Sequence, residues 1–461
     1  MSQNIPQNVK KILTILNDNG YEGYIVGGAV RDYIMGEQPH DWDIATNAKP
    51  EQVKSLFHRT IDTGIKHGTI TAMLKGEGYE ITTYRCDGFY SDGRHPDSIE
   101  FVSRIEDDLA RRDFTINAMA MDVDGNIVDP YGGLEDIKNG IIRCVGNPDD
   151  RFSEDALRMM RALRFESKLA FELDPATKDA ISRNADKIQR VSAERIHNEL
   201  TKMLVSKMPK KGFIDAYETG ITKHILPEFD RMMQCEQDVS YHYATVGIHT
   251  LDAVENIKPD LHLRWTMFLH DVGKPDAKDS KEIADKIMRR LHFTNRDRFR
   301  IDSLIENHDL ILSKPNEIRK FAALCGSKYI DSLCAVKVAD IKAHSSPCRD
   351  SMMQEHMGFI DKCRGYLADG TAIKKSDLKV NSYRLQDCGL KGEAIGKFLT
   401  QAYEVCLVEP ELNNRETLMK MAKERVEEIK SNYENNLDNM QLTIEEKCMA
   451  SNDDIETDLE V

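Results

Sequence analysis

Two carboxylates one residue apart, Asp41 and Asp43, follow a pair of glycines, Gly27 and Gly28, near the start of the chain. On an extended strand, residues i and i+2 point to the same side, so the two carboxylates would face one way. Carboxylate oxygens are ligands that hard divalent cations such as Mg²⁺ prefer. The glycines separate the apolar run Tyr24–Val26 from a helix-compatible stretch, and a helix N-terminus can bind phosphate through its N–H groups. A phosphate site close to metal-binding carboxylates is the minimal equipment for transferring a nucleotide.

Two consecutive arginines, Arg111 and Arg112, precede Asp113. A guanidinium group pairs bidentately with phosphate oxygens, so this pair suits contacts with a triphosphate or a sugar. Asp113 would orient one of the guanidinium groups. The alternative is the start of a surface helix that is capped by its own aspartate.

A third set of charged residues lies in the segment Glu154–Phe165. Asp155 and Arg158 are three residues apart and would share one helix face, which Arg161 and Arg164 extend. An aspartate beside an arginine presents acceptors and donors that could read the Watson–Crick edge of a base. The alternative is a helix salt bridge worth roughly a few tenths of a kcal/mol.

A fourth set contains two histidines and two aspartates far apart in the sequence: His249, His270, Asp271 and Asp340. It resembles the four-ligand pattern of HD-type metal phosphohydrolases. Imidazole and carboxylate together suit a transition metal or Mg²⁺. His308 matches one member of the additional histidine pair of two-metal versions, but the other member has no counterpart soon after Lys274-Pro275, which disfavours a dinuclear site. The alternative is a helical scaffold that binds no metal.

The motifs together resemble one family. In the family's order and at about its spacing they are GGAVRD (27–32), DWD (41–43), KHGTIT (66–71), RRDFTINA (111–118), DPYGG (129–133) and EDALRMMRALRF (154–165). On these motifs the chain resembles the class II tRNA nucleotidyltransferases, which comprise the bacterial CCA-adding enzymes and poly(A) polymerases. The resemblance is strong over residues 21–205 and weak over much of the rest.

The resemblance implies a role for each site residue. Asp41 and Asp43 would hold two Mg²⁺ ions, and Glu80 is a candidate third catalytic carboxylate. Asp155 and Arg158 would serve as a protein template for the base of CTP or ATP. The full nucleotide-binding set would be Gly28, Arg31, Arg112, Asp155, Arg158, Arg161 and Arg164.

Two stretches favour one activity within the family. The KHGTIT stretch resembles the tRNA enzymes, and the basic, aromatic run of poly(A) polymerases does not follow the carboxylates. The loop at 86–98 occupies the place of the flexible loop that accompanies full CCA addition. We therefore expect addition of CCA to tRNA 3′ ends from CTP and ATP. A poly(A) polymerase, an A-only or CC-only enzyme, an HD-type phosphohydrolase acting on nucleotides or RNA ends, and a non-catalytic RNA-binding protein remain alternatives.

The sequence pattern predicts an α+β head followed by helices. An amphipathic helix is expected within residues 1–20, where Val9, Ile12, Leu13 and Leu16 recur at helical spacing. Strand-like runs follow at Tyr24–Val26, Thr69–Leu74, Tyr79–Tyr84, Ile99–Val102 and Ala118–Met121. Beyond Pro148 the periodicity is helical, over Ser153–Phe165, Pro175–Asn184, Ala193–Val205 and Gly212–Thr219. With the resemblance, this gives a polymerase-β-type nucleotidyltransferase head (1–146), a helical neck (147–226), an HD-like body (227–345), a helical tail that docks tRNA (346–430) and an acidic, disordered tail (431–461).

The composition is that of a globular protein, with 40% hydrophobic and 31% charged residues among 461. No apolar run approaches the roughly 18 residues of a membrane span, and the first residues show no secretory signal. Ten cysteines without a CxxC pair favour reduced thiols in the cytoplasm. The net charge of −15 argues mildly against a nucleic-acid partner, but residues 431–461 alone carry nine acids against one lysine. The oligomeric state is left open.

Overall fold

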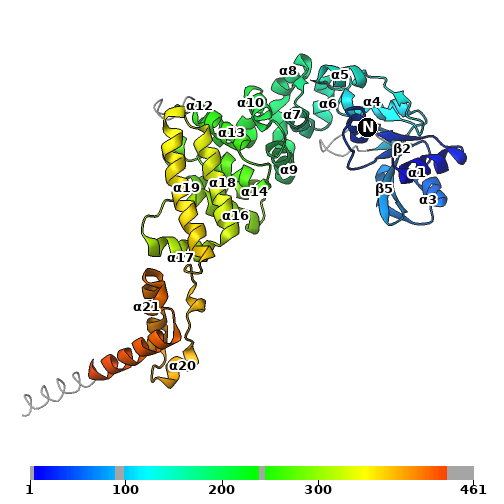
Figure 1. The fold of residues 1–461 in the computed structure, drawn as a ribbon. Helices are drawn as coiled ribbons and strands as arrows, with labels where there is room; N and C mark the ends of the chain where they lie inside the picture. The colour runs from blue at the N-terminus through cyan, green and yellow to red at the C-terminus, as the bar shows by residue number, and fades with distance from the viewer. Residues whose placement is uncertain (1–4, 89–97, 238–243, 433–461) are drawn as a thin grey trace, which may run out of the picture. The chain divides into compact units, whose positions relative to one another are not determined.

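The computed structural model describes residues 5–88, 98–237 and 244–432 (Figure 1). It divides into two compact units. The first runs up to His308 and also takes in Ala335–Arg349, and the second consists of Asp309–Cys334 and the chain from Asp350 onward. The predicted acidic tail, except for its first two residues, and most of the predicted loop at 86–98 lie outside the described residues. The domain limits given above stay predictions.

The N-terminal part of the first unit is built on a seven-stranded mixed sheet with the order β3-β4-β5-β2-β1-β8-β9. Strands β2 and β5 are parallel, and the other neighbouring pairs are antiparallel. The strands are β1 (Gly23–Val26), β2 (Ile44–Thr46), β3 (Thr60–Gly64), β4 (Thr69–Leu74), β5 (Glu77–Thr83), β8 (Ala120–Met121) and β9 (Ile127–Val128). Two small sheets pair β6 (Arg85–Asp87) with β7 (Ile99–Phe101) and β10 (Ile141–Ile142) with β11 (Glu172–Leu173).

Both faces of the large sheet are covered by helices. Helices α1 (Gln7–Asp18) and α3 (Pro50–Leu56) contribute to one core together with Ile25 of β1, whereas the next residue, Val26, belongs to a second core with α4 (Ile105–Ala110). Successive side chains of a strand point to opposite faces, which explains why β1 serves both cores. The prediction of an amphipathic first helix is confirmed, because its four expected core residues are all buried.

The sequence pattern located some strands and missed others. Each predicted strand-like run overlaps an observed strand, but β2, β3, β6, β9, β10 and β11 were not predicted. All three residues of β2 are buried, so a run this short shows no alternation of polar and apolar residues. Strand β3 lies at the edge of the sheet and is mostly exposed, and even its apolar residue Ile61 is 45% exposed, so it has no buried face. Neither strand therefore carries the period of two that marks a half-buried strand.

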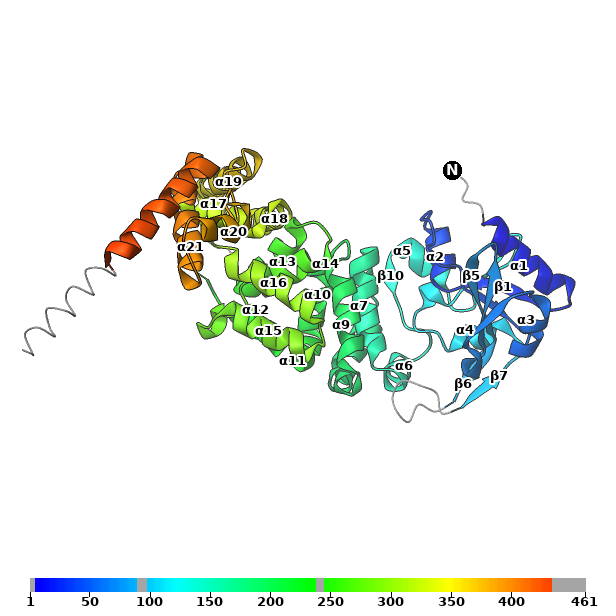
Figure 2. The same ribbon diagram turned by 90° about the horizontal axis from the view of Figure 1, so that it is seen from below.

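A helical neck follows the sheet, and one of its predicted helices is wrong. The expected single helix over Ser153–Phe165 is two helices, because α6 ends at Glu154 and α7 begins at Leu157. Between them Asp155 is extended (φ −142°, ψ 105°), and its carboxylate accepts a hydrogen bond from the Leu157 N–H (3.0 Å). The neck helices are α6 (Pro148–Glu154), α7 (Leu157–Leu169), α8 (Pro175–Asn184), α9 (Ala193–Leu204) and α10 (Pro209–Glu218). Figure 2 shows α7 and α9 side by side.

The remaining described elements are helical. In the first unit they are α2 (Gly28–Ile34), α5 (Gly133–Asn139), α11 (Ile221–Ile225), α12 (Pro227–Gln234), α13 (Val246–Asn256), α14 (Leu261–Leu269), α15 (Ser280–Arg290) and α16 (Asn295–Asn307). The second unit contains α17 (Pro315–Cys325), most of α19 (Ser346–Ala368), α20 (Ser382–Asp387) and α21 (Glu393–Val408), and α18 (Ser327–Ala343) belongs to both units. Short 3₁₀ helices lie at Ile65–His67, Thr115–Asn117, Ala185–Arg190, Lys274–Asp276, Lys375–Asp377 and Pro410–Leu412. Among the described residues, no helix combines the length and apolarity needed to cross a membrane.

Candidate functional site

The predicted catalytic carboxylates line one cleft of about 700 Å³ in the head: Asp41, Asp43 and Glu80. Ile44 of β2 pairs with Ile81 of the parallel strand β5. Asp43 and Glu80 each come one residue before a member of this pair, so they lie at the same height along the two strands. The prediction that one strand carries both aspartates is wrong, because β2 begins at Ile44. The backbone ladder nevertheless reaches Asp43, whose carbonyl accepts a hydrogen bond from the Val26 N–H (3.0 Å).

The electrostatics of this cleft favour a bound cation. Burial raises the pKa of Asp43, and the neighbouring carboxylates of Glu80 and Asp41 raise it further, whereas Arg112 lowers it. Carboxylates that crowd together in this way repel one another until a positive charge comes between them. The three side chains offer oxygen donors alone, which suits Mg²⁺. The donor set therefore fits the predicted metal ions.

The glycine pair allows an arginine to approach the backbone. Gly27 lies between β1 and α2 with φ +71°, a value that L-residues rarely adopt. A Cβ atom on Gly27 would lie 2.8 Å from Nη1 of Arg112, so any other residue would force the end of this flexible side chain to shift. Burial lowers the pKa of Arg112, and its Nε makes no hydrogen bond. A buried guanidinium nitrogen without an acceptor is suited to receive an anionic ligand.

A second cavity of about 310 Å³ adjoins the carboxylates, because Asp43 lines this cavity as well. Its cationic side chains are Arg31, Arg112, Arg161, Arg164 and Lys168, and both glycines line it too. Arg31 is buried, and its guanidinium donates to Asp32 (2.6 and 2.9 Å) and to Asn117 (2.6 Å). The cavity thus combines one carboxylate of the cleft with a concentration of positive charge suited to phosphates.

A third cavity of about 320 Å³ continues from the second, because Arg112 and Arg161 line both. Asp155 and Arg158 line this third cavity together. Asp155 is in the break between α6 and α7, so the prediction that the two residues share a helix face is wrong. The tertiary structure nevertheless brings both side chains to the same space.

Each member of the predicted template pair is held by other groups. Arg195 on α9 donates two hydrogen bonds to the Asp155 carboxylate, at 2.6 and 3.3 Å. The Arg158 guanidinium pairs with Glu154 and donates to the backbone carbonyls of Arg111 (3.1 Å) and Arg151 (3.2 Å). Both side chains are therefore fixed in place before any ligand arrives.

The two supporting arginines on α7 are also paired. Arg161 donates from Nη2 and Nε to one oxygen of Asp113, Oδ2 (2.6 and 2.7 Å), and this ion pair outweighs the effect of burial and lowers the pKa of that carboxyl. Arg164 pairs with Glu199 on α9 and stacks over the ring of Phe165, 4.1 Å from its centroid. These contacts connect the arginines of α7 to the head on one side and to α9 on the other.

Several cavity residues were not predicted as site residues. Arg195 contacts Asp155 across 40 positions of sequence, and nothing in its own helix marks it as part of the site. Asn117 and Phe165 lie inside two of the recognised motifs, so their position was a signal that could have been used. Lys168 follows Arg161 and Arg164 on α7 at helical spacing, and the same periodicity could have identified it.

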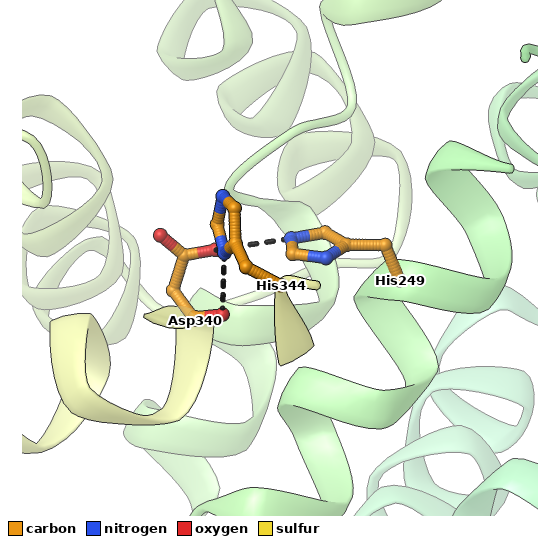
Figure 3. A group of neighbouring side chains, drawn as sticks. All are labelled: His249, Asp340 and His344. Carbon is orange, nitrogen blue, oxygen red and sulfur yellow. Dashed lines mark hydrogen bonds and ion pairs between the residues drawn. The ribbon is translucent and has the colours of Figure 1, made fainter. Parts of the chain in front are cut away.

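The fourth set also converges in the structure. His249 of α13, His270 and Asp271 at the end of α14, and Asp340 of α18 are all buried and face one another. Burial lowers the pKa of His270, but Asp271 and Asp340 outweigh this effect and raise it to about 10. His344, which was not predicted, lies one helical turn after Asp340 and donates from Nδ1 to its carbonyl (2.9 Å). Figure 3 shows the rings of His249 and His344 beside Asp340.

Comparison with known proteins gives family matches over two parts of the chain. Residues 23–143 match the poly A polymerase head domain, and residues 170–233 match the probable RNA and SrmB-binding site of polymerase A. Over 444 residues the chain is 36% identical to the CCA-adding enzyme of Ligilactobacillus salivarius, covering 92% of this chain and 99% of that enzyme.

Solved structures agree with these matches. The CCA-adding enzyme of Bacillus stearothermophilus in complex with CTP is similar with a TM-score of 0.69 and 29% identity, over 92% of this chain and 98% of that one. The Thermotoga maritima CCA-adding enzyme complexed with tRNA shares the fold, with a TM-score of 0.56 and 19% identity over 92% of this chain and 97% of that one.

Proposed function

Because the chain belongs to the family of CCA-adding enzymes, we propose that its head and neck complete tRNA 3′ ends by adding C, C and A from CTP and ATP without a nucleic-acid template. The roles proposed for the individual residues rest on one observation: the three cavities adjoin one another and share lining residues. Asp43 lines the first and second, and Arg112 and Arg161 line the second and third. A single nucleotide could then meet carboxylates at its phosphates and the Asp155–Arg158 pair at its base.

The carboxylates would act at the reacting phosphate. Asp41 and Asp43, with Glu80 as a third carboxylate, would hold Mg²⁺ ions. When bound, these ions supply the positive charge that lowers the pKa of the primer 3′-hydroxyl and offsets charge on the leaving pyrophosphate. The burial of Asp43 beside two other carboxylates supports this assignment, because such a group gains most from a cation.

The glycines and arginines of the second cavity would bind the triphosphate. Arg112, with its Nε lacking an acceptor, would pair with phosphate oxygens across Gly27 and Gly28. Arg31, already held by Asp32 and Asn117, would keep positive charge next to the nucleotide. Guanidinium groups fixed in this way stabilise the phosphates without first losing side-chain freedom.

Asp155 and Arg158 would select the base. Cytosine and adenine each carry an exocyclic amino group that donates a hydrogen bond, next to a ring nitrogen that accepts one. The Asp155 carboxylate would accept from the amino group, and the Arg158 guanidinium would donate to the ring nitrogen. Uracil and guanine place a carbonyl oxygen where the amino group should be, so Asp155 would reject them.

The tRNA itself would be recognised by shape and phosphates rather than by base sequence, as is usual for helical RNA. The cysteines whose side chains are described are all free thiols, which supports action in a reducing compartment such as the cytoplasm.

The proposal is tested with tRNAs that end before CCA, after C and after CC, incubated with CTP and ATP singly and together. We expect C, C and A to be added in order and then to stop. A CC-only, A-only or homopolymeric product would replace CCA addition by the corresponding alternative. The double variant Asp41→Ala, Asp43→Ala should abolish incorporation, and incorporation at the wild-type rate would overturn the assigned mechanism.

A further inference from the structure

One cation of the second cavity has no counter-charge of its own. The four arginines that line this cavity are each paired with a carboxylate: Arg31 with Asp32, Arg112 with Asp108, Arg161 with Asp113 and Arg164 with Glu199. Lys168 lines the same cavity, and within the described part of the chain its ammonium group forms neither a hydrogen bond nor an ion pair. Its charge is therefore available to an anionic ligand that enters the cavity.

Lys168 stands last in a row of cations along α7. The row consists of Arg158, Arg161, Arg164 and Lys168, which are three, three and four residues apart and so lie on one side of the helix. Arg158 lines the third cavity, and Lys168 lies ten residues further on, or about 15 Å along the helix axis. An extended nucleoside triphosphate has a comparable length from the edge of its base to its outer phosphates. A nucleotide with its base at Arg158 would thus bring its β- and γ-phosphates to Lys168.

The leaving pyrophosphate needs a proton as well as positive charge. As the primer 3′-oxygen bonds to the α-phosphorus, the bond from that phosphorus to the bridging oxygen breaks, and the electron pair stays on the bridging oxygen. A positioned acid that protonates this oxygen lowers the barrier. A guanidinium keeps its protons in proteins, whereas an ammonium can release one. Of the cations that line the second cavity, Lys168 is therefore the one that can donate a proton.

The surroundings of Lys168 make its ammonium group a better acid. Partial burial lowers the pKa of Lys168, and the guanidinium groups of Arg31 and Arg164 lower it further. The carboxylates of Asp32 and Glu37 act in the opposite direction, but the pKa stays below its ordinary value. Acid catalysis is most efficient when the pKa of the donor lies near the working pH, so this shift favours proton transfer.

We propose that Lys168 is a catalytic residue that contacts the β-phosphate of the bound nucleotide and protonates the leaving pyrophosphate. This inference rests on the proposed function, because it assigns a role within that reaction. Nζ gives one proton to the bridging oxygen as its bond to the α-phosphorus breaks, and the primer 3′-hydroxyl loses its own proton to water. Lys168 leaves the step as a neutral amine and takes a proton from water after pyrophosphate has departed.

The test separates proton donation from attraction by charge alone. Single-turnover rates and the Kd for CTP are measured on tRNA that ends before CCA. Lys168→Arg keeps the positive charge but holds its protons, so we expect a Kd close to that of the wild type and a rate about 100-fold lower. Lys168→Met should lose as much rate and also bind CTP about fivefold more weakly, as expected for the loss of an ion pair at a partly exposed site.

CTP analogues give a second readout. With CH₂ or CF₂ in place of the oxygen between the β- and γ-phosphorus atoms, the leaving bisphosphonate is respectively the more basic or the less basic anion. The wild-type rate should differ little between the two analogues, because Lys168 protonates either leaving group. In Lys168→Arg the rate should fall further with CH₂ and recover with CF₂, since the less basic anion departs without a proton. An equal response of wild type and variant would overturn proton donation by Lys168.

Controls keep this inference distinct from the proposed function. Lys138→Met removes a lysine of α5 that lines none of the three cavities and whose side chain is 76% exposed, so its rates should match the wild type with either analogue. Lys168 is also exposed, so its variants should keep the wild-type Tm. A wild-type protein that adds no nucleotide from CTP would refute the proposed function itself. An active wild type beside a Lys168→Arg variant of equal rate would refute the role of Lys168 alone.

Discussion

Replacing Arg195 with methionine should weaken base selection, although Arg195 lies on a helix that the sequence does not connect with the site. Arg195 donates two hydrogen bonds to Asp155, and both side chains are largely buried, at 21% and 15% exposure. In the variant, Asp155 would keep the Leu157 N–H as its hydrogen-bond donor (3.0 Å). The carboxylate would then leave the position from which it accepts the amino group of cytosine or adenine.

The expected loss follows from the contacts. A hydrogen bond to a charged group is worth about 1.5–3 kcal/mol, and partial exposure places this pair toward the lower end. A loss of about 2 kcal/mol in transition-state binding corresponds to roughly a 30-fold fall in kcat/KM. The fall should affect CTP and ATP alike, and misincorporation of UTP and GTP should rise. Arg195→Lys should be intermediate, because an ammonium cannot form the bidentate contact.

The assay measures kcat/KM for each nucleotide on tRNA that lacks CCA. Arg183→Met is the matched control, because it removes an arginine paired with Asp149 at the surface, where the two side chains are 57% and 41% exposed. The control should change neither rate nor selectivity. If Arg195→Met stays folded and keeps kcat/KM and selectivity within about twofold of wild type, Arg195 does not position Asp155 and the reasoning fails.

Three further predictions concern other parts of the first unit. Glu80→Gln should lower kcat at least about 100-fold with little change in Tm, because it removes one negative charge beside Asp43. Steady-state kinetics at saturating Mg²⁺ measure this effect. An unchanged kcat would show that Glu80 is not part of the catalytic site. Gly27→Ala should raise the KM for CTP and for ATP about tenfold. The new Cβ would lie 2.8 Å from Nη1 of Arg112 and push the guanidinium aside, and the positive φ of residue 27 adds about 1–2 kcal/mol of strain. KM values equal to those of the wild type would show that Arg112 does not bind the nucleotide. Burial raises the pKa of Glu166 to about 9, so the folded state keeps a proton that the unfolded state releases near its ordinary value of 4.5, and stability falls as the pH rises between these values. Glu166→Gln should therefore match wild type near pH 5 and exceed its free energy of unfolding by about 2–4 kcal/mol at pH 8, and a constant difference in urea unfolding at the two pH values would contradict the buried proton.

Much of the site could be predicted because chemistry and sequence spacing coincide there. The turn between β1 and α2 requires the positive φ of Gly27, which glycine adopts easily. Asp41 and Asp43 are one residue apart, so they stay close whether or not β2 includes them. The periodic apolar residues of α1 likewise determined a helix, since their burial does not depend on a distant partner. Family membership followed from the order of such local motifs.

Local spacing was insufficient where a residue's neighbour depends on tertiary structure. The run Ser153–Phe165 is compatible with one helix, but Asp155 breaks it by capping Leu157 and pairing with Arg195 on another helix. Glu80 could be only a candidate, because the parallel pairing of β2 with β5 sets its distance from Asp43.

The sequence by itself predicted which residues would carry the chemistry: the glycine pair, the two aspartates and the arginine motifs, with a fourth set in the helical body. Only the tertiary structure decided which of their atoms face one another. It placed Asp43, Arg112 and Asp155 along connected cavities, and it directed Nε2 of His270 toward two carboxylates from different helices. The physical reason is that residue types are written in the sequence, whereas the orientation, burial and pairing of side chains arise only when distant segments pack together.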